Sequence, residues 1–190
     1  MNSNELLTAR ALCVIDVGAS GGLSEPFKGL SNIQPIFVEP DDRAAAELER
    51  QFPNVRLLRT ALSNFEGRVQ FHLAREQECS SCLEPNMAFL SRFPNPERFE
   101  TIKTIELPAS TLDAQMADVG IDPDFIKLDV QGYESQIMEG GTRCLERAMG
   151  AIIEVEFVPL YRGQKLFPEV HSTMSSRGFE LYDLQRSFWK

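Results

Sequence analysis

Residues 14–22 read VIDVGASGG, a β-branched run that passes directly into a glycine-rich turn. Short apolar runs closed by turn residues are typical of strands buried in a parallel sheet. In an open parallel sheet, ligands bind beyond the carboxyl ends of the strands, at the point where the strand order reverses. We therefore expect residues 13–17 to form a central strand and the turn after them to border a ligand site.

Further apolar runs alternate with helical periodicity along the chain, and this alternation favours parallel strands joined by helices. No repeat, low-complexity tract or linker divides residues 1–190, so the pattern predicts one α/β domain. The other expected parallel strands are 36–38, 55–58, 125–129 and 151–157, followed by a terminal strand at 179–184. The expected helices are 41–52, 111–119, 132–147 with an interruption at 140–141, and 167–178.

Two other segments depart from this alternation. Apolar and polar side chains alternate in residues 69–73, which predicts an antiparallel strand added to the sheet, and residues 102–107 indicate another strand. Residues 75–100 are polar, contain prolines and have no sustained period. A stretch this long inside a compact domain is usually functional, so we expect a lid or binding loop there.

The composition excludes several classes of partner. The chain carries a formal net charge of −9, which argues against nucleic acid, because phosphate binding needs clustered Lys and Arg. No run approaches the ~20 apolar residues that cross a bilayer, and the first residues lack a secretory-signal pattern. We therefore expect a cytoplasmic protein. Cys79 and Cys82 form a lone C-x-x-C, and since zinc takes four ligands, we expect no metal site.

The glycine turn departs from the dinucleotide fingerprint G-x-G-x-x-G. Gly18 matches the first position, but Ser20 and Leu23 stand where the second and third glycines belong. Asp16, at the end of the strand, would repel a diphosphate and attract an ammonium or sulfonium group. The turn therefore favours a cationic nucleoside, and an NAD-dependent oxidoreductase is the weaker alternative.

Glu39 ends the next strand, 21 residues after Gly18, near the spacing at which an acidic side chain contacts a ribose. A carboxylate there can accept hydrogen bonds from both ribose hydroxyls. Asp16 would hold a ligand ammonium, and the backbone N–H groups after Gly18 would hold a ligand carboxylate. Together these features describe S-adenosylmethionine.

Six stretches, in their order and spacing, resemble the FkbM-type S-adenosylmethionine-dependent methyltransferases over roughly residues 14–184. The most specific is FIKLDVQGYE, with the pattern K-x-D-x-x-G-x-E at Lys127, Asp129, Gly132 and Glu134. The others are VIDVGASGG, IFVEPD, TALSN, the STLD at 110–113, and AIIEVEF, in which Glu154 matches the family's acid.

The resemblance implies a class I methyltransferase fold, a Rossmann-like three-layer sandwich with a mostly parallel sheet. It also implies O-methylation of a hydroxyl on a sugar, glycan or natural-product-like molecule. The implied cofactor-binding residues are Asp16, Gly18, Ala19 and Gly21 at the methionine end, Glu39 and Pro40 at the ribose, and Ala61 and Leu62 at the adenine.

Two departures from the family pattern matter. Gln131 stands where many relatives carry Glu, so any role of that acid is not available here. Only QRSFWK follows residue 184, which leaves little room for the antiparallel last strand that such folds insert beside the fifth. Without that strand one sheet edge is open, and a contact in a homo-oligomer or a missing segment would cover it.

Methyl transfer chiefly requires an oxygen held about 3 Å from the methyl carbon, and a nearby base assists when the oxygen belongs to an alcohol. Asp129, at the end of the strand 125–129, is the expected active-site acid. Lys127 points to the same face, either for catalysis or for an ion pair at the sheet end. Glu134 begins the next helix, where it either contacts the substrate or stabilises the helix terminus.

Four further residues are expected near a small-molecule or glycan substrate. Glu156 shares a strand face with Glu154, and it would reach either the substrate or a basic partner. Because the base is not identified by the pattern alone, a module that binds the cofactor without catalysis is a further alternative. The expected substrate contacts are Tyr133, Glu156, Arg162 and Ser81.

Overall fold

The computed structural model describes residues 10–23 and 25–186. Its centre is a five-stranded sheet of parallel strands in the order β3-β2-β1-β7-β8. The strand order reverses at β1, between β2 and β7, and the expected Rossmann-like α/β fold is confirmed. The strands are β1 Leu12–Val17, β2 Ile33–Val38, β3 Arg56–Leu58, β7 Phe125–Leu128 and β8 Gly150–Ile153.

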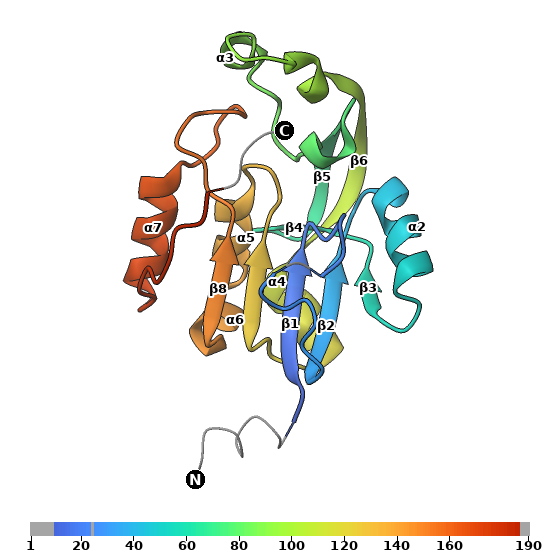
Figure 1. The fold of residues 1–190 in the computed structure, drawn as a ribbon, viewed down its shortest axis with the longest axis vertical. Coiled ribbons are helices and arrows are strands. Elements are labelled where there is room, and N and C mark those ends of the chain that lie inside the picture. The colour runs from blue at the N-terminus through green and yellow to red at the C-terminus, as the bar shows by residue number, and fades with distance from the viewer. Residues whose placement is uncertain (1–9, 24, 187–190) are drawn as a thin grey trace.

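β1 is buried on both faces, since five of its six residues are buried. A strand covered on both sides reads as a continuous apolar run, which explains why this one was recognisable in the sequence. Its one charged residue, Asp16, lies in register with Phe37 of β2 and Lys127 of β7. Figure 1 shows the carboxyl ends of these strands pointing to the top of the molecule.

The helices surround this sheet. Figure 1 shows α4, α5 and α6 behind it, with α2 beside β3 and α7 beside β8. Asp41 caps α2 by accepting the N–H of Arg43, and Thr111 caps α4 by accepting the N–H of Ala114. Within the described residues, no helix has the length and apolar character needed to cross a bilayer. The helices are α2 Asp42–Gln51, α4 Leu112–Val119, α5 Glu134–Gly140, α6 Thr142–Arg147 and α7 Phe167–Ser176.

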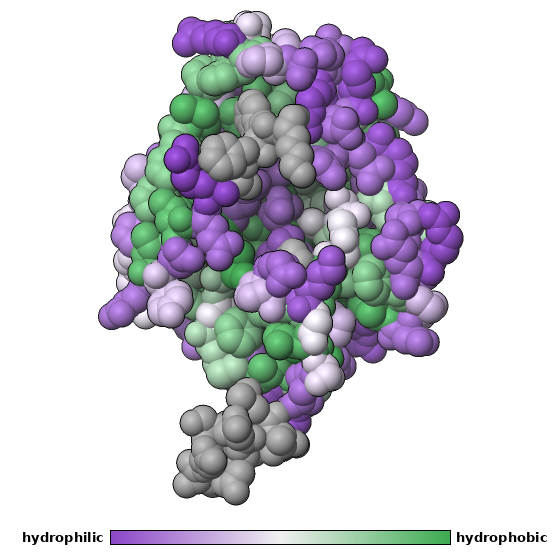
Figure 2. Space-filling view, viewed as in Figure 1, coloured by the Kyte–Doolittle hydropathy of each residue, from purple (hydrophilic) through white to green (hydrophobic). Residues whose placement is uncertain are grey.

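A second sheet stands beside the first, in the order β4-β6-β5. The antiparallel strand expected at 69–73 belongs to it, so the prediction that this strand extends the central sheet was wrong. The edge strand β3 offers only three residues, whereas β5 pairs with the longer β6 along most of its length. Most of β6 is exposed. Figure 1 places β6 at the upper right of the molecule, and Figure 2, in the same view, shows hydrophilic side chains along that border. The strands are β4 Ala61–Ser63, β5 Gly67–Ala74 and β6 Thr101–Thr111.

The segment 75–100 is more ordered than its sequence pattern indicates. It contains the 3-10 helices η1 Gln77–Cys79 and η2 Pro96–Phe99 and the short helix α3 Met87–Leu90. Phe99 and Leu90 pack with Tyr161 in an apolar cluster separate from the main core. Figure 1 shows this segment above the carboxyl ends of the parallel strands.

Two expected strands differ in the structure. β8 ends at Ile153 rather than at residue 157, although the N–H of Glu154 still donates to the carbonyl of Leu128 at 2.8 Å. Residues 179–184 form no strand, and the side chain of Tyr182 is fully exposed, so this stretch has no core to cover. The interruption expected at 140–141 is confirmed, because α5 ends at Gly140 and α6 begins at Thr142.

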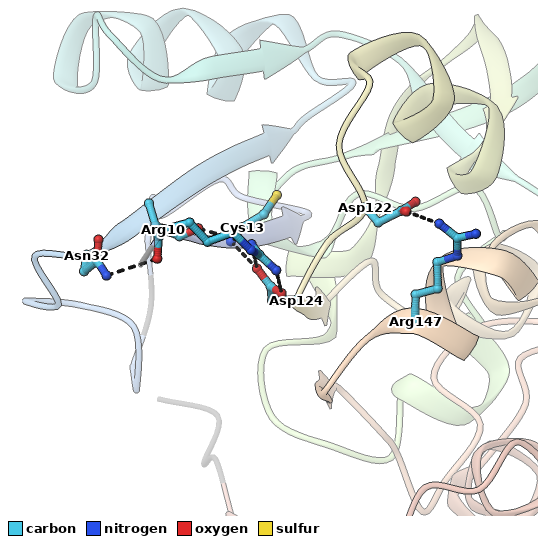
Figure 3. A network of polar contacts seen from close by, with 7 residues as sticks. Arg10, Cys13, Asn32, Asp122, Asp124 and Arg147 are labelled. Carbon is cyan, nitrogen blue, oxygen red and sulfur yellow. Dashed lines mark hydrogen bonds and ion pairs between the residues drawn. The ribbon is translucent and has the colours of Figure 1, made fainter. Parts of the chain in front are cut away.

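A polar clamp joins the amino ends of β1 and β7, opposite the carboxyl ends (Figure 3). The guanidinium of Arg10 donates to both carboxylate oxygens of Asp124, at 2.7 and 2.6 Å. The backbone N–H of Cys13 donates to the same carboxylate at 2.8 Å, and Asn32 bonds the carbonyl of Arg10. Nearby, Arg147 pairs with Asp122. This end of the sheet is therefore fixed by charged side chains.

Candidate functional site

A cavity of about 550 Å³ lies beyond the carboxyl ends of β1, β2 and β7. Its volume is in the range of small-molecule sites, and its position is the one expected for a ligand of this fold. The expected site residues that line it are Gly18, Gly21, Glu39, Pro40, Ala61, Leu62, Lys127, Asp129 and Tyr133. The expected site residues outside its wall are Asp16, Ala19, Ser81, Glu134, Glu156 and Arg162.

The turn after β1 approaches β7 closely. Gly18 has φ +78°, and a Cβ built on it would lie 1.8 Å from the carbonyl oxygen of Asp129. The N–H groups of Gly18 and Ala19 both donate to the carbonyl of Val38, so Ala19 does not contribute to the row of N–H groups expected to face a ligand after Gly18. Within the described residues, no acceptor is recorded for the N–H groups of Ser20 and Gly21, which therefore remain for a ligand.

The acidic end of β2 forms a second wall. Glu39 is 5% exposed, and its Oε1 accepts the N–H of Asp41 at 2.9 Å. Burial raises the pKa of Glu39 to about 7. Asp41 forms a two-pronged ion pair with Arg43, whose guanidinium also donates to Ser80 of the segment 75–100 at 3.3 Å. This chain of contacts connects the start of α2 to the segment above the cavity.

Lys127 joins two carboxylates at the switch point. Its Nζ lies 2.8 Å from Oδ1 of Asp16, which is fully buried, and 3.6 Å from Oδ2 of Asp129, which faces the cavity. Burial alone would lower the pKa of Lys127, but the two carboxylates outweigh it and raise the pKa. One of the two roles expected for Lys127, an ion pair at the sheet end, is therefore present. Asp16 pairs with this ammonium and does not itself line the cavity. Oδ2 of Asp16 has no hydrogen-bond partner within the described residues.

Asp129 also takes part in a second group, in which the side chain of Gln131 lies between two acids. Its Nε2 donates to Oδ1 of Asp129 at 3.1 Å and to Oε2 of Glu154 at 2.7 Å. Burial, followed by the neighbouring charge of Asp129, raises the pKa of Glu154 to about 10. All three residues line the cavity.

Glu134 and Glu156 lie behind this wall. Glu134 is 3% exposed, and its Oε1 accepts the N–H groups of Val130 and Gly132 at 2.9 and 3.3 Å. Burial raises the pKa of Glu134 to about 8 and that of Glu156 to about 7. The contacts of Glu134 hold the turn between β7 and α5, which positions Asp129.

The remaining expected contacts hold the walls of the cavity together. The hydroxyl of Tyr133 lies 3.0 Å from Oγ of Ser63, and Ser81 donates to the carbonyl of Gln131 at 2.8 Å. Arg162 is exposed, and its guanidinium pairs with Glu84 at 3.4 Å. Ser81 and Arg162 therefore connect the segment 75–100 to the rest of the molecule.

Several lining residues lie outside the set of site residues predicted from the sequence, although Glu154 matches the family's acid there. Glu154 and Gln131 become neighbours only because the turn after β7 folds beside the end of β8. The sequence signal for Glu154 was its charge next to an apolar run, and for Gln131 its place between Asp129 and Gly132. The wall also includes the polar residues Ser20, Glu25, Lys28, Asp41, Thr60, Gln77, Glu78 and Ser80.

The cavity wall is strongly acidic, since six of its lining residues are Asp or Glu and two are Lys. An acidic wall attracts cations and disfavours phosphates. Within the described residues, no group of three or more His, Cys, Asp or Glu is placed to hold a metal ion.

Comparison with known proteins shows which family the chain resembles. A family model described as the methyltransferase FkbM domain matches residues 16–181. The chain is 30% identical, over 168 residues, to the 2-O-methyltransferase NoeI of Sinorhizobium fredii (strain NBRC 101917 / NGR234). This match covers 80% of the chain and 66% of the relative, so the chain spans just under two thirds of that protein's length. No solved structure matches the chain.

Proposed function

Because the chain belongs to the FkbM methyltransferase family, we propose that it transfers a methyl group from S-adenosylmethionine to a hydroxyl oxygen. The acceptor is a sugar, a glycan or a natural-product-like small molecule. The observation that carries the proposal is that Glu39, the turn at Gly18 and Asp129 line one cavity at the switch point of the sheet.

The residues of the cavity fit S-adenosylmethionine. The N–H groups of Ser20 and Gly21 suit its carboxylate, and the acidic wall suits its ammonium and sulfonium charges. Glu39 suits the ribose hydroxyls, because one carboxylate can accept two hydrogen bonds. Ala61 and Leu62 supply an apolar surface for the adenine.

When bound, S-adenosylmethionine supplies an electrophilic methyl group. The protein's part is to hold the acceptor hydroxyl in line and to take its proton. Asp129 is the candidate acceptor of that proton, because it lines the cavity and its side chain is 38% exposed. Lys127 of β7 lies 3.6 Å from this carboxylate and helps to orient it, and Gln77, Glu78 and Ser80 of the segment 75–100 line the same cavity.

The charge of the cavity also limits the acceptor. A phosphorylated or carboxylated sugar would meet repulsion from the acidic wall, whereas a neutral or amine-bearing sugar would not. The relative from Sinorhizobium fredii is named as a 2-O-methyltransferase, which supports a hydroxyl as the acceptor. We therefore assign neutral polyols and glycans as the substrate class.

The test is transfer of a labelled methyl group from S-adenosylmethionine to a panel of neutral sugars and oligosaccharides, with their phosphorylated counterparts alongside. We expect transfer to neutral acceptors, and Asp129→Asn is expected to lower turnover more than cofactor affinity. Glu106→Gln, on the exposed part of β6, is the control and keeps full turnover. Cofactor binding without transfer to any hydroxyl would identify a non-catalytic binding module instead.

A further inference from the structure

Gln131 is held in an unfavourable backbone conformation inside the cavity wall. Its φ is +58°, in the left-handed region that costs a residue with a Cβ roughly 1–2 kcal/mol. Strain of this kind persists where the surroundings determine it and is concentrated at functional sites. The side chain of Gln131 is therefore a candidate for a functional role.

The surroundings fix Gln131 from three sides. Ser81 donates to its carbonyl at 2.8 Å, and the hydroxyl of Tyr161 lies 3.2 Å from its Oε1. Its Nε2 faces the carboxylates of Asp129 and Glu154. Tyr161 is fully buried, and it also bonds the carbonyl of Cys79 at 2.9 Å. Ser81, from the segment 75–100, and Tyr161 therefore hold the side-chain amide of Gln131 toward the two acids.

The two acids are coupled to each other as well. The carboxyl groups of Asp129 and Glu154 lie side by side, because the same amide nitrogen of Gln131 donates to both, at 3.1 and 2.7 Å. Two carboxyls in one site do not both ionise readily, because like charges at short range repel. Burial, followed by the charge of Asp129, raises the pKa of Glu154, so Glu154 is the member of the pair that favours the protonated form.

We propose that Gln131 is a positioning residue whose amide holds Asp129 and Glu154 side by side as a pair that carries a single negative charge, with Asp129 as the member that accepts the acceptor's hydroxyl proton. A third carboxylate at position 131 would add charge to the pair, whereas the neutral amide donates to both acids. This inference rests on the proposed function, because it assigns the base of that reaction.

The proton and charge balance of the step is complete. The hydroxyl oxygen forms a bond to the methyl carbon, and the electron pair of the broken carbon–sulfur bond stays on sulfur. The hydroxyl proton moves to Asp129, whose negative charge is neutralised as the positive charge on sulfur is lost. No metal, oxidant or further reactant is needed.

Other charged and titratable groups surround the pair, and they bear on its pH dependence. Lys127 stabilises the ionised form of Asp129 from β7, with Asp16 of β1 behind it. The acids Glu134 and Glu156 face Glu154 and disfavour a second negative charge. Tyr161, whose hydroxyl lies near Oε1 of Gln131 and the carbonyl of Cys79, is a further titratable group beside the pair.

Two variants of Gln131 test the proposal. Gln131→Gly removes the amide and suits the positive φ, so a loss of function in this variant does not come from backbone strain. Gln131→Glu keeps the size of the side chain but replaces the donor with a third carboxyl. Gln34→Glu, on the exposed part of β2, is the matched control for an added charge.

The first readout is the pH profile of kcat/KM. Removing an N–H donor disfavours the ionised acid, so the acid limb of the profile is expected to move to higher pH by about one unit in Gln131→Gly, and further in Gln131→Glu. Gln34→Glu is expected to keep the wild-type profile. A uniform loss of rate with an unmoved acid limb in both Gln131 variants would overturn the proposal, because it would show a structural role only.

The second readout does not depend on methyl transfer. Carbon-13 NMR titration of the carboxyl signals in the cofactor-free protein is expected to show one carboxyl of the pair protonated at neutral pH. The other is expected to titrate at higher pH in both Gln131 variants. If both carboxyls were ionised at neutral pH, the proposal would be wrong. If the titration followed this expectation but no acceptor were methylated, the proposed function would fail while the charge state of the pair would stand.

Discussion

The backbone of Gly18 lies against that of Asp129, so that a Cβ on Gly18 would come within 1.8 Å of the carbonyl oxygen of Asp129. This contact brings the turn after β1 to the carboxyl end of β7, where the cavity opens. The N–H of Asp129 in turn donates to the carbonyl of Val17 at 3.0 Å. The candidate acid and the candidate cofactor turn are therefore one rigid unit.

Gly18→Ala is expected to destabilise the protein and to displace Asp129. The left-handed φ alone costs about 1–2 kcal/mol, and the clash with backbone adds to it. Gly21→Ala is the matched control in the same turn, because no atom lies within 4 Å of the added Cβ. Urea denaturation checks both. Equal stability of the two variants would contradict the close approach of β1 and β7.

Lys127→Met is expected to lower the free energy of unfolding by about 3–5 kcal/mol at neutral pH, because the buried carboxylate of Asp16 loses its ammonium partner. Without that partner, burial raises the pKa of Asp16 further in the folded state. A raised folded-state pKa makes the protein more stable at low pH, so the deficit shrinks as the pH falls and Asp16 takes up a proton.

Denaturation of Lys127→Met across a pH series checks this, with Lys103→Met on the exposed face of β6 as the control. The control is expected to follow the wild type within about 0.5 kcal/mol. A pH-independent deficit in Lys127→Met would show that the lost aliphatic contacts of the lysine, rather than the charge of Asp16, cause the effect.

Asp124→Ala is expected to lower the free energy of unfolding by about 1–3 kcal/mol, because the N–H of Cys13 would lose its acceptor. Hydrogen bonds from Arg10, followed by that from Cys13, hold the pKa of Asp124 below its ordinary value. Because the pKa of Asp124 is lower in the folded state than in the unfolded state, this carboxylate stabilises the protein at pH values above its unfolded-state pKa. That contribution is lost as the pH falls through its folded-state pKa. The stability gap between wild type and variant is therefore expected to narrow in acid.

Thermal denaturation at neutral and acid pH measures this gap. Asp118→Ala, at an exposed position of α4, is the control and is expected to change little. Since Asp124 lies at the end of the sheet opposite the cavity, cofactor affinity is expected to be the same in Asp124→Ala as in the wild type. Reduced affinity without a loss of stability would contradict the separation of the two ends.

The central strands could be predicted because their sequence pattern is local. The runs of β1, β2 and β7 are mostly apolar, and each is followed directly by a glycine or an acidic residue, Gly18, Glu39 or Asp129, that marks the site. The extent of β8 and the sheet to which β5 belongs depend on partners distant in the sequence. The contact of Glu154 with Gln131, 23 residues before it, is one such distant pairing, which no local period indicates.

The same distinction holds for the candidate site. Gly18, Glu39 and Asp129 follow strands whose order is set by the fold, and all three line the cavity. The burial of Asp16 behind Lys127 depends on the register of β1 with β7, which the sequence does not state. The roles proposed for these residues remain predictions, and their test is binding and turnover.

The wild-type affinity for S-adenosylmethionine is expected to fall as the pH falls through about 7. Burial raises the pKa of Glu39 to about 7, and only the ionised carboxylate accepts both ribose hydroxyls. Protonation of Glu39 therefore removes part of the contact. The Glu39→Gln variant is expected to bind S-adenosylmethionine weakly at every pH, so that its affinity depends less on pH than that of the wild type. Fluorescence titration with S-adenosylmethionine from neutral to mildly acid pH checks both expectations.

The most direct test of the central claim is calorimetric titration of the protein with S-adenosylmethionine and with NAD, together with Glu39→Ala and the control Glu106→Ala. We expect wild type and Glu106→Ala to bind S-adenosylmethionine alike and to ignore NAD. Glu39→Ala is expected to bind it about 10- to 100-fold more weakly, the loss of hydrogen bonds to a charged group. Binding of NAD alone, or equal affinity in Glu39→Ala, would contradict the account.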